Sequence, residues 1–366
     1  MGFKCGIVGL PNVGKSTLFN ALLSTIAAEA ANYPFCTIEP NVGRVNVPDE
    51  RLEKLAAIAG SAQIIPTQLE FVDIAGLVRG ASKGEGLGNQ FLAHIREVDA
   101  IIYMLRCFED GNITHVEGLI DPMRDAEIVE TELVLADLES LEKRLPALQK
   151  KAKTDKEIAE QVALMERILA VVSEGHPARN TELKDEAEKR QMKLLQLLTS
   201  KPVLYVCNVD EESAANGNAL SNKVMEMAKK KNAPCVVISA RIESEISMLP
   251  SEEDKKEFLS SLNLSETGLS RIIKAGYELL DLSTYFTIGP KEARAWTITV
   301  GTTAPAAAGV IHSDFEKGFI RAETIAYDDY IAYNGEAGTK EAGKFRLEGK
   351  EYRVKDGDVL HFRFNN

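Results

Sequence analysis

The stretch Gly9-Leu10-Pro11-Asn12-Val13-Gly14-Lys15-Ser16-Thr17 decides the fold of this 366-residue chain. It follows an apolar run, residues 3–10, that predicts a buried strand, and it leads into apolar residues at helical spacing up to Leu23. Such a loop needs glycines because its backbone N–H groups must point inward at phosphate oxygens, in conformations that a Cβ would obstruct. The strand, loop and helix therefore predict a P-loop phosphate-binding site.

Within this loop, Lys15 and Ser16 have the most specific predicted roles. We expect the Lys15 ammonium to contact the β- and γ-phosphate oxygens and the Ser16 hydroxyl to bind Mg²⁺. The N-terminus of the following helix adds its positive end to the same phosphates. The residues of the loop that we predict to bind the nucleotide are Asn12, Val13, Gly14, Lys15, Ser16 and Thr17.

Two later segments predict the rest of the magnesium site. Asp73-Ile74-Ala75-Gly76 closes a second strand, where P-loop proteins place a carboxylate near magnesium and a glycine N–H on the γ-phosphate. Thr37 matches the switch-loop threonine that completes the magnesium shell in GTPases, although taken alone it is more simply a turn residue. We therefore predict Ser16 and Thr37 as metal ligands.

The residue that orients the attacking water is not evident in the sequence. Leu77 follows Gly76 at the place where Ras-like enzymes carry a water-orienting glutamine, and an aliphatic side chain cannot orient water. Hydrolysis must then depend on Mg²⁺, on the nucleotide's own phosphate, on the segment 76–88, or on a cation such as K⁺ near Asn12. We expect slow basal turnover and leave the catalytic residue unassigned.

The base-specificity segment Asn208-Val209-Asp210-Glu211 departs from the Asn-Lys-x-Asp pattern of guanine readers. Adenine has an acceptor at N1 and no N2 amine, so a carboxylate aimed at that edge has no reason to prefer it. We therefore predict that Asn208 and Val209 bind an adenine nucleotide, with Val209 packing on the ring. A shifted frame in which Asp210 or Glu211 still selects guanine is the open alternative. Ser239-Ala240-Arg241 is similar to the last GTPase loop, which supports the base.

Apolar spacing divides the chain into parts. Strand-like runs alternate with helical ones, which predicts an α/β fold with a mostly parallel sheet covered on both faces; the runs after the first are 68–74, 99–108, 202–209 and 233–239. Between about 124 and 200, Leu, Glu, Lys and Ala at helical spacing predict an antiparallel helical insertion with a turn near 175–177. Its charges are most simply a solvated helix face. From 282 onward, short strand-like pieces predict a small α+β domain with one helix over about 308–315.

Composition and charge exclude several classes of protein. The five cysteines lie far apart in the sequence, so they form neither a zinc pattern nor a disulfide framework. No apolar stretch approaches the roughly 20 residues that cross a bilayer, and the N-terminus lacks a secretory signal. We therefore expect a cytoplasmic protein that does not bind membranes. The net charge of −12 argues against general affinity for a polyanion but allows a local basic patch.

With these residues identified, the sequence resembles the YchF subfamily of Obg-related P-loop proteins, the Obg-like ATPases, over nearly its whole length. The resemblance rests on the phosphate loop and on residues 32–41, 73–78, 80–89, 318–323 and 356–359. It implies an OBG-type G domain over residues 3–281, interrupted by a coiled-coil-like helical hairpin. It also implies a C-terminal TGS domain over residues 282–365, a ubiquitin-like β-grasp module.

The resemblance also implies an activity and partners. The family prefers ATP to GTP, which implies hydrolysis to ADP and phosphate with Mg²⁺ at Ser16 and Thr37 and adenine at Val209; Leu77 matches the family's replacement of the catalytic glutamine. Family members associate with ribosomes and can bind nucleic acid. We therefore expect a monomeric, nucleotide-dependent switch that binds the large subunit and the whole ribosome and is linked to translation or stress regulation. The alternatives are a guanine-specific GTPase and a ribosome- or RNA-binding adaptor whose hydrolysis is incidental.

Overall fold

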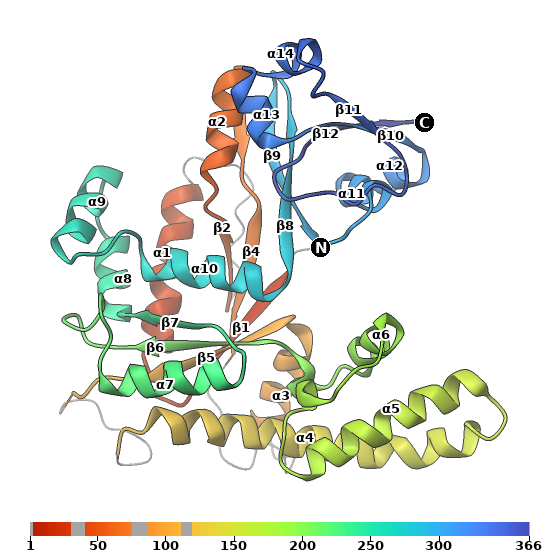
Figure 1. Cartoon of the computed structure of the whole chain (residues 1–366). Coiled ribbons are helices and arrows are strands. Elements are labelled where there is room, and N and C mark those ends of the chain that lie inside the picture. The colour runs from red at the N-terminus through yellow and green to blue at the C-terminus, as the bar shows by residue number, and fades with distance from the viewer. Residues whose placement is uncertain (1–2, 31–40, 75–86, 111–118, 366) are drawn as a thin grey trace.

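Two sheets organise the chain in the computed structural model, which describes residues 3–30, 41–74, 87–110 and 119–365 (Figure 1). The first sheet has the order β2 (Val42–Asn46), β4 (Gln68–Asp73), β1 (Lys4–Val8), β5 (Ala100–Arg106), β6 (Val203–Asn208) and β7 (Cys235–Ile238). The second sheet has the order β11 (Arg346–Glu348), β10 (Phe319–Ile325), β12 (Val359–Phe364), β8 (Leu282–Ile288), β9 (Glu292–Thr299) and β3 (Gln63–Ile65).

The first sheet is parallel except where β2 runs antiparallel to β4. Every residue of β5 and β6 is buried, as expected for strands that have helices on both faces. The helices around this sheet are α1 (Lys15–Ala30), α3 (Leu87–Glu97), α7 (Ala219–Lys230), α8 (Ala240–Ser247), α9 (Glu252–Ser261) and α10 (Gly268–Leu279). The predicted mostly parallel α/β sheet is confirmed, and its carboxyl edge is where ligands bind in such folds.

The predicted helical insertion is an antiparallel pair, α4 (Pro122–Lys151) and α5 (Lys156–Ser173), that projects from the first sheet (Figure 1). The chain reverses at residues 152–155, not at the glycine near 175 that the sequence analysis singled out. Asp155 sets this reversal, because its carboxylate caps α5 by accepting from Glu157 N and Ile158 N. Gly175, with a φ of +83°, instead follows the end of α5. The chain then returns through η2 (Ala178–Asn180), α6 (Glu186–Leu195) and η3 (Leu198–Ser200).

One buried carboxylate, Asp137, and one partly buried carboxylate, Glu130, attach the near half of α4 to the body of the protein. Asp137 accepts from Leu198 N and Thr199 N at 2.8 Å, and from the Thr199 hydroxyl at 2.6 Å. Glu130 pairs with Arg179 and, at 2.6 Å, with Lys231 just after α7. Burial acts to raise the pKa of Glu130, but these two cations lower it below its ordinary value. The base of the hairpin is therefore fixed by paired, partly desolvated charges.

The C-terminal part is the predicted α+β domain, with a mixed sheet and short helices. These are α11 (Ala304–Ile311), α12 (Ser313–Lys317), α13 (Tyr327–Ala332) and α14 (Glu336–Glu341). The single helix predicted over 308–315 is wrong, because the chain becomes extended at His312, whose ring nitrogen accepts from Asp314 N and starts α12. None of the helices in the described part of the chain is long and apolar enough to cross a bilayer.

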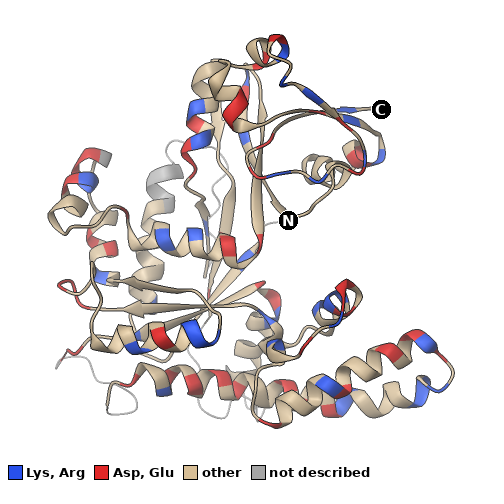
Figure 2. Cartoon of the chain, viewed as in Figure 1, with Lys and Arg blue, Asp and Glu red and all other residues tan. Residues whose placement is uncertain are grey.

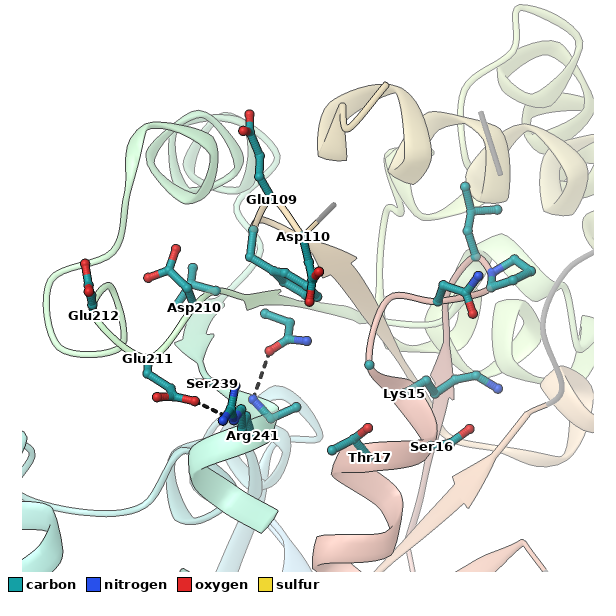
Figure 3. Close-up of a pocket in the computed structure, with 18 residues that line it drawn as sticks. Lys15, Ser16, Thr17, Glu109, Asp110, Asp210, Glu211, Glu212, Ser239 and Arg241 are labelled. Carbon is teal, nitrogen blue, oxygen red and sulfur yellow. Dashed lines mark hydrogen bonds and ion pairs between the residues drawn. The ribbon is translucent and has the colours of Figure 1, made fainter. Parts of the chain in front are cut away.

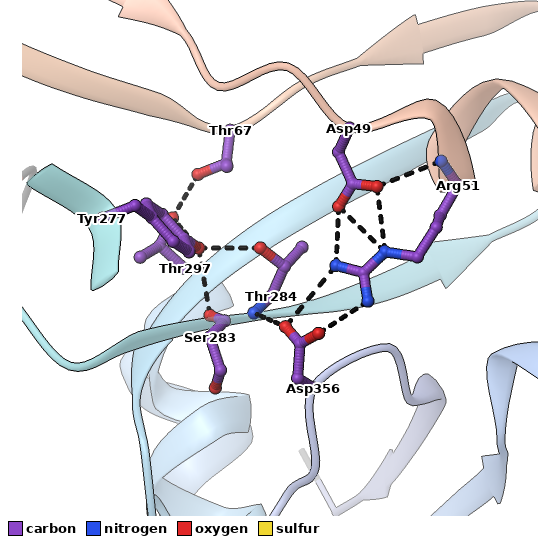
Figure 4. Close-up of polar contacts among 8 residues, drawn as sticks. All are labelled: Asp49, Arg51, Thr67, Tyr277, Ser283, Thr284, Thr297 and Asp356. Carbon is purple, nitrogen blue, oxygen red and sulfur yellow. Dashed lines mark hydrogen bonds and ion pairs between the residues drawn. The ribbon is translucent and has the colours of Figure 1, made fainter. Parts of the chain in front are cut away.

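A segment from the N-terminal half also joins the second sheet. Helix α2 (Glu50–Ala59) buries Leu52 and Leu55 in one cluster with Phe286, and β3 pairs in parallel with β9. Figure 4 shows the polar side of this contact, where Arg51 Nη1 lies 2.6 Å from Asp356 Oδ2. The same carboxylate accepts from Thr284 N at 2.8 Å. The chain between β2 and β4 therefore packs on a sheet that is otherwise built from residues after 281.

Candidate nucleotide-binding site

The phosphate loop leaves β1 and enters α1 through backbone angles that demand particular residues. Asn12 has a φ of +62° and Gly14 a φ of +94°, and only glycine adopts the latter without strain. A Cβ added at Gly14 would lie 2.3 Å from Asn208 Nδ2, and one at Gly9 would lie 2.6 Å from the Met104 carbonyl oxygen. Close packing thus requires glycine at both positions, and at Gly14 the backbone conformation requires it as well.

A pocket of about 1020 Å³ lies against this loop at the carboxyl edge of the first sheet (Figure 3). The loops that follow β1, β5, β6 and β7 form its walls. Its lining residues are Leu10, Pro11, Asn12, Gly14, Lys15, Ser16, Thr17, Phe108, Glu109, Asp110, Asn208, Val209, Asp210, Glu211, Glu212, Ser239, Ala240 and Arg241. The structure therefore brings the phosphate loop together with the segments 208–211 and 239–241, both of which lie more than 190 residues further along the chain.

Asn208 joins these loops. Its amide Nδ2 donates to the Val13 carbonyl at 2.9 Å, and its Oδ1 accepts from Ala240 N at 2.9 Å. The side chain is only 4% exposed, so both hydrogen bonds are shielded from water. Asn208 thus positions the phosphate loop against the loop after β7. Val209, the other residue predicted to bind the base, is 2% exposed and lines the pocket.

Asp210 and Glu211 lie at the end of the pocket predicted to bind the nucleotide base, which we call the base end, and both of their carboxylates already have partners. Glu211 Oε1 lies 2.6 Å from Arg241 Nε, and Figure 3 shows this pair beside the N-terminus of α8. Asp210 Oδ1 accepts from Ser213 N at 2.8 Å. The Arg241 side chain is 76% exposed, so this ion pair stabilises little but holds the Glu211 carboxylate toward Arg241.

The pocket wall that follows β5 was not predicted from the sequence. Arg106, 1% exposed, donates through Nε to the Phe108 carbonyl at 3.2 Å and through Nη2 to the Asp110 carbonyl at 3.4 Å. Its guanidinium also lies 4.7 Å from the centre of the Phe108 ring. Arg106 therefore shapes the segment of pocket wall that contains Phe108. An arginine at the end of an otherwise apolar strand is the signal in the sequence that could have indicated this wall, because a buried guanidinium must find hydrogen-bond acceptors nearby.

At the phosphate end, Lys15 Nζ donates to Asp73 Oδ1 at 2.8 Å and to the Ile74 carbonyl at 2.7 Å. The hydroxyl of Ser16 is exposed on the same loop. A carboxylate and a hydroxyl are hard oxygen donors of the kind that Mg²⁺ binds alongside phosphates, so this donor set fits the ion. No group of three or more His, Cys, Asp or Glu side chains within the described residues could hold a metal unaided. Thr37, Gly76 and Leu77 lie outside the described residues.

This arrangement defines the class of protein: the chain is a P-loop nucleoside triphosphatase with a GTPase-type fold. Its residues 4–135 match the family described as 50S ribosome-binding GTPase. Residues 282–365 match the family YchF-GTPase_C, described as a protein of unknown function (DUF933).

Several full-length relatives narrow the assignment. The chain is 59% identical to the "Ribosome-binding ATPase YchF" of Haemophilus influenzae and 55% identical to that of Bacillus subtilis, each match covering 100% of both chains. It is also similar to the solved structure of the Schizosaccharomyces pombe YchF GTPase, with a TM-score of 0.89 and 39% identity over 99% of this chain and 98% of that one. The chain belongs to the YchF family, and the resemblance found in the sequence is confirmed.

Proposed function

We propose that this protein hydrolyses ATP to ADP and phosphate and that the bound nucleotide controls its association with the ribosome. The observation that carries the choice of ATP is the state of the two base-end carboxylates. Glu211 is paired with Arg241 and Asp210 with a backbone N–H, whereas guanine selection needs a carboxylate aimed at N1 and N2. The names of the full-length relatives, which describe ribosome-binding ATPases, support the same activity.

The loop residues bind and orient the triphosphate. Backbone N–H groups from Asn12 to Thr17 and the start of α1 face the phosphates, and Lys15 turns from Asp73 to the phosphate oxygens when the nucleotide binds. Bound Mg²⁺ neutralises charge that develops on the phosphates during transfer. Ser16 and Thr37 would hold the ion, with the Asp73 carboxylate released from Lys15 to face its water shell. Asn12 lines the pocket beside the phosphates, so it is the residue that K⁺ would meet if a second cation is used.

At the other end of the pocket, we propose that the adenine ring lies between the apolar walls formed by Val209 and Phe108. Asn208 acts as a positioning residue, because both ends of its amide are already bonded to backbone. No described residue is assigned to orient the attacking water. We further propose a cytoplasmic monomer that contacts the ribosome, including its large subunit, and RNA there. The description of the matched G-domain family as 50S ribosome-binding supports the large subunit.

The test is equilibrium binding of non-hydrolysable ATP and GTP analogues to the purified protein with Mg²⁺. We expect at least a tenfold preference for ATP, equivalent to about 1.4 kcal/mol of discrimination. A preference for GTP would show that Asp210 or Glu211 selects guanine, and the protein would then be the guanine-specific GTPase. Hydrolysis measured in parallel in KCl and NaCl tests the second cation. Ribosome cosedimentation with an ATP analogue and with ADP separates a switch from an adaptor, since an adaptor would bind equally in both states.

A further inference from the structure

The helical hairpin carries its charges in two separate zones. Residues 122–142, next to the body, contain seven acidic residues and one arginine. Residues 143–156, at the far end, contain six basic residues and one acidic residue. In Figure 2 the ribbon of α4 is marked by acidic positions toward its base, and basic positions lie near the turn between α4 and α5. The far end is thus basic in a chain whose net charge is −12.

Four lysines at this end, which we call the tip lysines, are Lys150, Lys151, Lys153 and Lys156, and all four are exposed. None of their ammonium groups forms an ion pair with a carboxylate of the described residues, whereas the nearby Lys143 pairs with Glu139. The one anion among these residues, Asp155, caps α5 by accepting from backbone N–H groups, so the four cations keep a net positive charge and repel one another. Such a cluster is most stable when it meets an external anion.

The fold holds the tip lysines away from the acidic body. Thirty residues of α-helix span about 45 Å, which is several times the screening length of about 8 Å at physiological salt. The near half of α4 is fixed through Asp137 and Glu130, and the two helices share a packed core that includes Leu141, Leu164 and Ile168. The negative charge of the body is therefore screened from an anion at the tip.

We propose that the tip lysines bind the phosphate backbone of ribosomal RNA, which makes the end of the hairpin part of the ribosome-contacting surface. The choice of partner rests on the proposed function, while the site itself rests on the charges and their placement. Lysine ammonium groups contact phosphates without reading sequence, and residues 150–156 include no aromatic side chain that could stack on a base. The ligand is therefore the RNA backbone rather than exposed bases.

The test compares the full-length protein with a variant in which all four tip lysines are changed to glutamine. Glutamine keeps the helix propensity and removes the charge. A matched control changes Lys223, Lys229, Lys230 and Lys256, which are also exposed, to glutamine and gives the same net charge. The probes are purified bacterial ribosomes and protein-free ribosomal RNA, with affinity measured over a range of KCl concentrations. ATP hydrolysis without ribosomes and the thermal midpoint check that each variant is folded.

We expect the tip variant to bind both probes on the order of 100-fold more weakly near 0.15 M KCl, with a salt slope shallower by about 3. The control variant should stay within about threefold of the wild type. Equal binding by tip variant and wild type would overturn the tip site and leave ribosome binding standing. Weaker binding to ribosomes but not to free RNA, or an unchanged salt slope, would overturn the choice of RNA phosphate. Failure of the wild-type protein to bind either probe would overturn the proposed partner itself.

Discussion

Replacing Asn208 with alanine removes the amide that joins the phosphate loop to the loop after β7. The substitution deletes two hydrogen bonds of 2.9 Å and leaves the Val13 carbonyl and the Ala240 N–H without their side-chain partner. Both groups face a site where water has little access, since Asn208 is 4% exposed. Leaving a buried backbone group unsatisfied costs about 1–3 kcal/mol.

For two such groups we expect a total cost of roughly 2–6 kcal/mol. The nucleotide binds to the loops that Asn208 holds in place, so this cost appears in the affinity. Even the lower end of this range, if it is expressed in full, weakens binding of an ATP analogue by roughly 30-fold. Asn208→Asp is a sharper variant, because it keeps an acceptor for Ala240 N but places an oxygen against the Val13 carbonyl. It should bind no more tightly than Asn208→Ala.

The assay is equilibrium binding of an ATP analogue with Mg²⁺, together with the thermal midpoint of each variant. Asn222→Ala, an exposed asparagine on α7, is the matched control and should bind like the wild type. An affinity for Asn208→Ala within threefold of the wild type would refute the positioning role. It would then follow that the phosphate loop is held by its own backbone and by the packing around Gly14.

Three further predictions test other parts of the structure. Lys15→Ala removes the only cation of the phosphate loop and should weaken ATP-analogue binding by at least 100-fold, a loss of about 2.7 kcal/mol or more. An unchanged affinity in titration calorimetry would contradict the assignment of this loop as the phosphate-binding site. Asp356→Asn breaks the ion pair with Arg51, and because the Asp356 side chain is 53% exposed we expect it to lower local stability by only about 0.5–1 kcal/mol. The loss should appear as faster amide exchange in β8, and the difference from the wild type should disappear at high salt. A difference that does not depend on salt would point to packing instead. Glu130→Gln should destabilise the protein by roughly 1–3 kcal/mol at pH 7. Because folding lowers the pKa of the Glu130 carboxyl below its ordinary value of 4.5, its charge stabilises the folded state above that value. This contribution is lost as the pH falls through the lowered pKa, so the thermal midpoints of variant and wild type should converge as the pH falls below 4.5. A gap between the midpoints that does not depend on pH would show that the charge is unimportant.

The parts of the fold that were predictable from the sequence are those set by neighbouring residues. The strand and helix around the phosphate loop follow from local apolar spacing, and the loop between them follows from glycines that allow unusual backbone angles. The reversal at 152–155 was missed although Asp155 signals it, because a glycine further along gives a more familiar turn signal. The roles of Thr37 and Leu77 stay predictions.

The parts that were not predictable depend on contacts between residues far apart in the chain. Nothing near α2 indicates that it will pack on Phe286, since that contact joins residues more than 220 positions apart. Arg106 was read only as part of a strand, because its acceptors are backbone carbonyls of a loop whose path the sequence does not specify. The same holds for Asn208, which the sequence placed at the base and the structure bonds to the phosphate loop.

The sequence by itself determined the class of chemistry, because phosphate binding requires glycines, a lysine and a hydroxyl within one short loop whose geometry is local. It also determined the order of sheet, hairpin and C-terminal domain, since each has its own apolar period. Only the tertiary structure decided which side chains meet across loops, and it alone showed that the segment between β2 and β4 completes the second sheet. Those outcomes depend on packing and hydrogen bonding between distant segments, whose free energy exists only once the chain is folded.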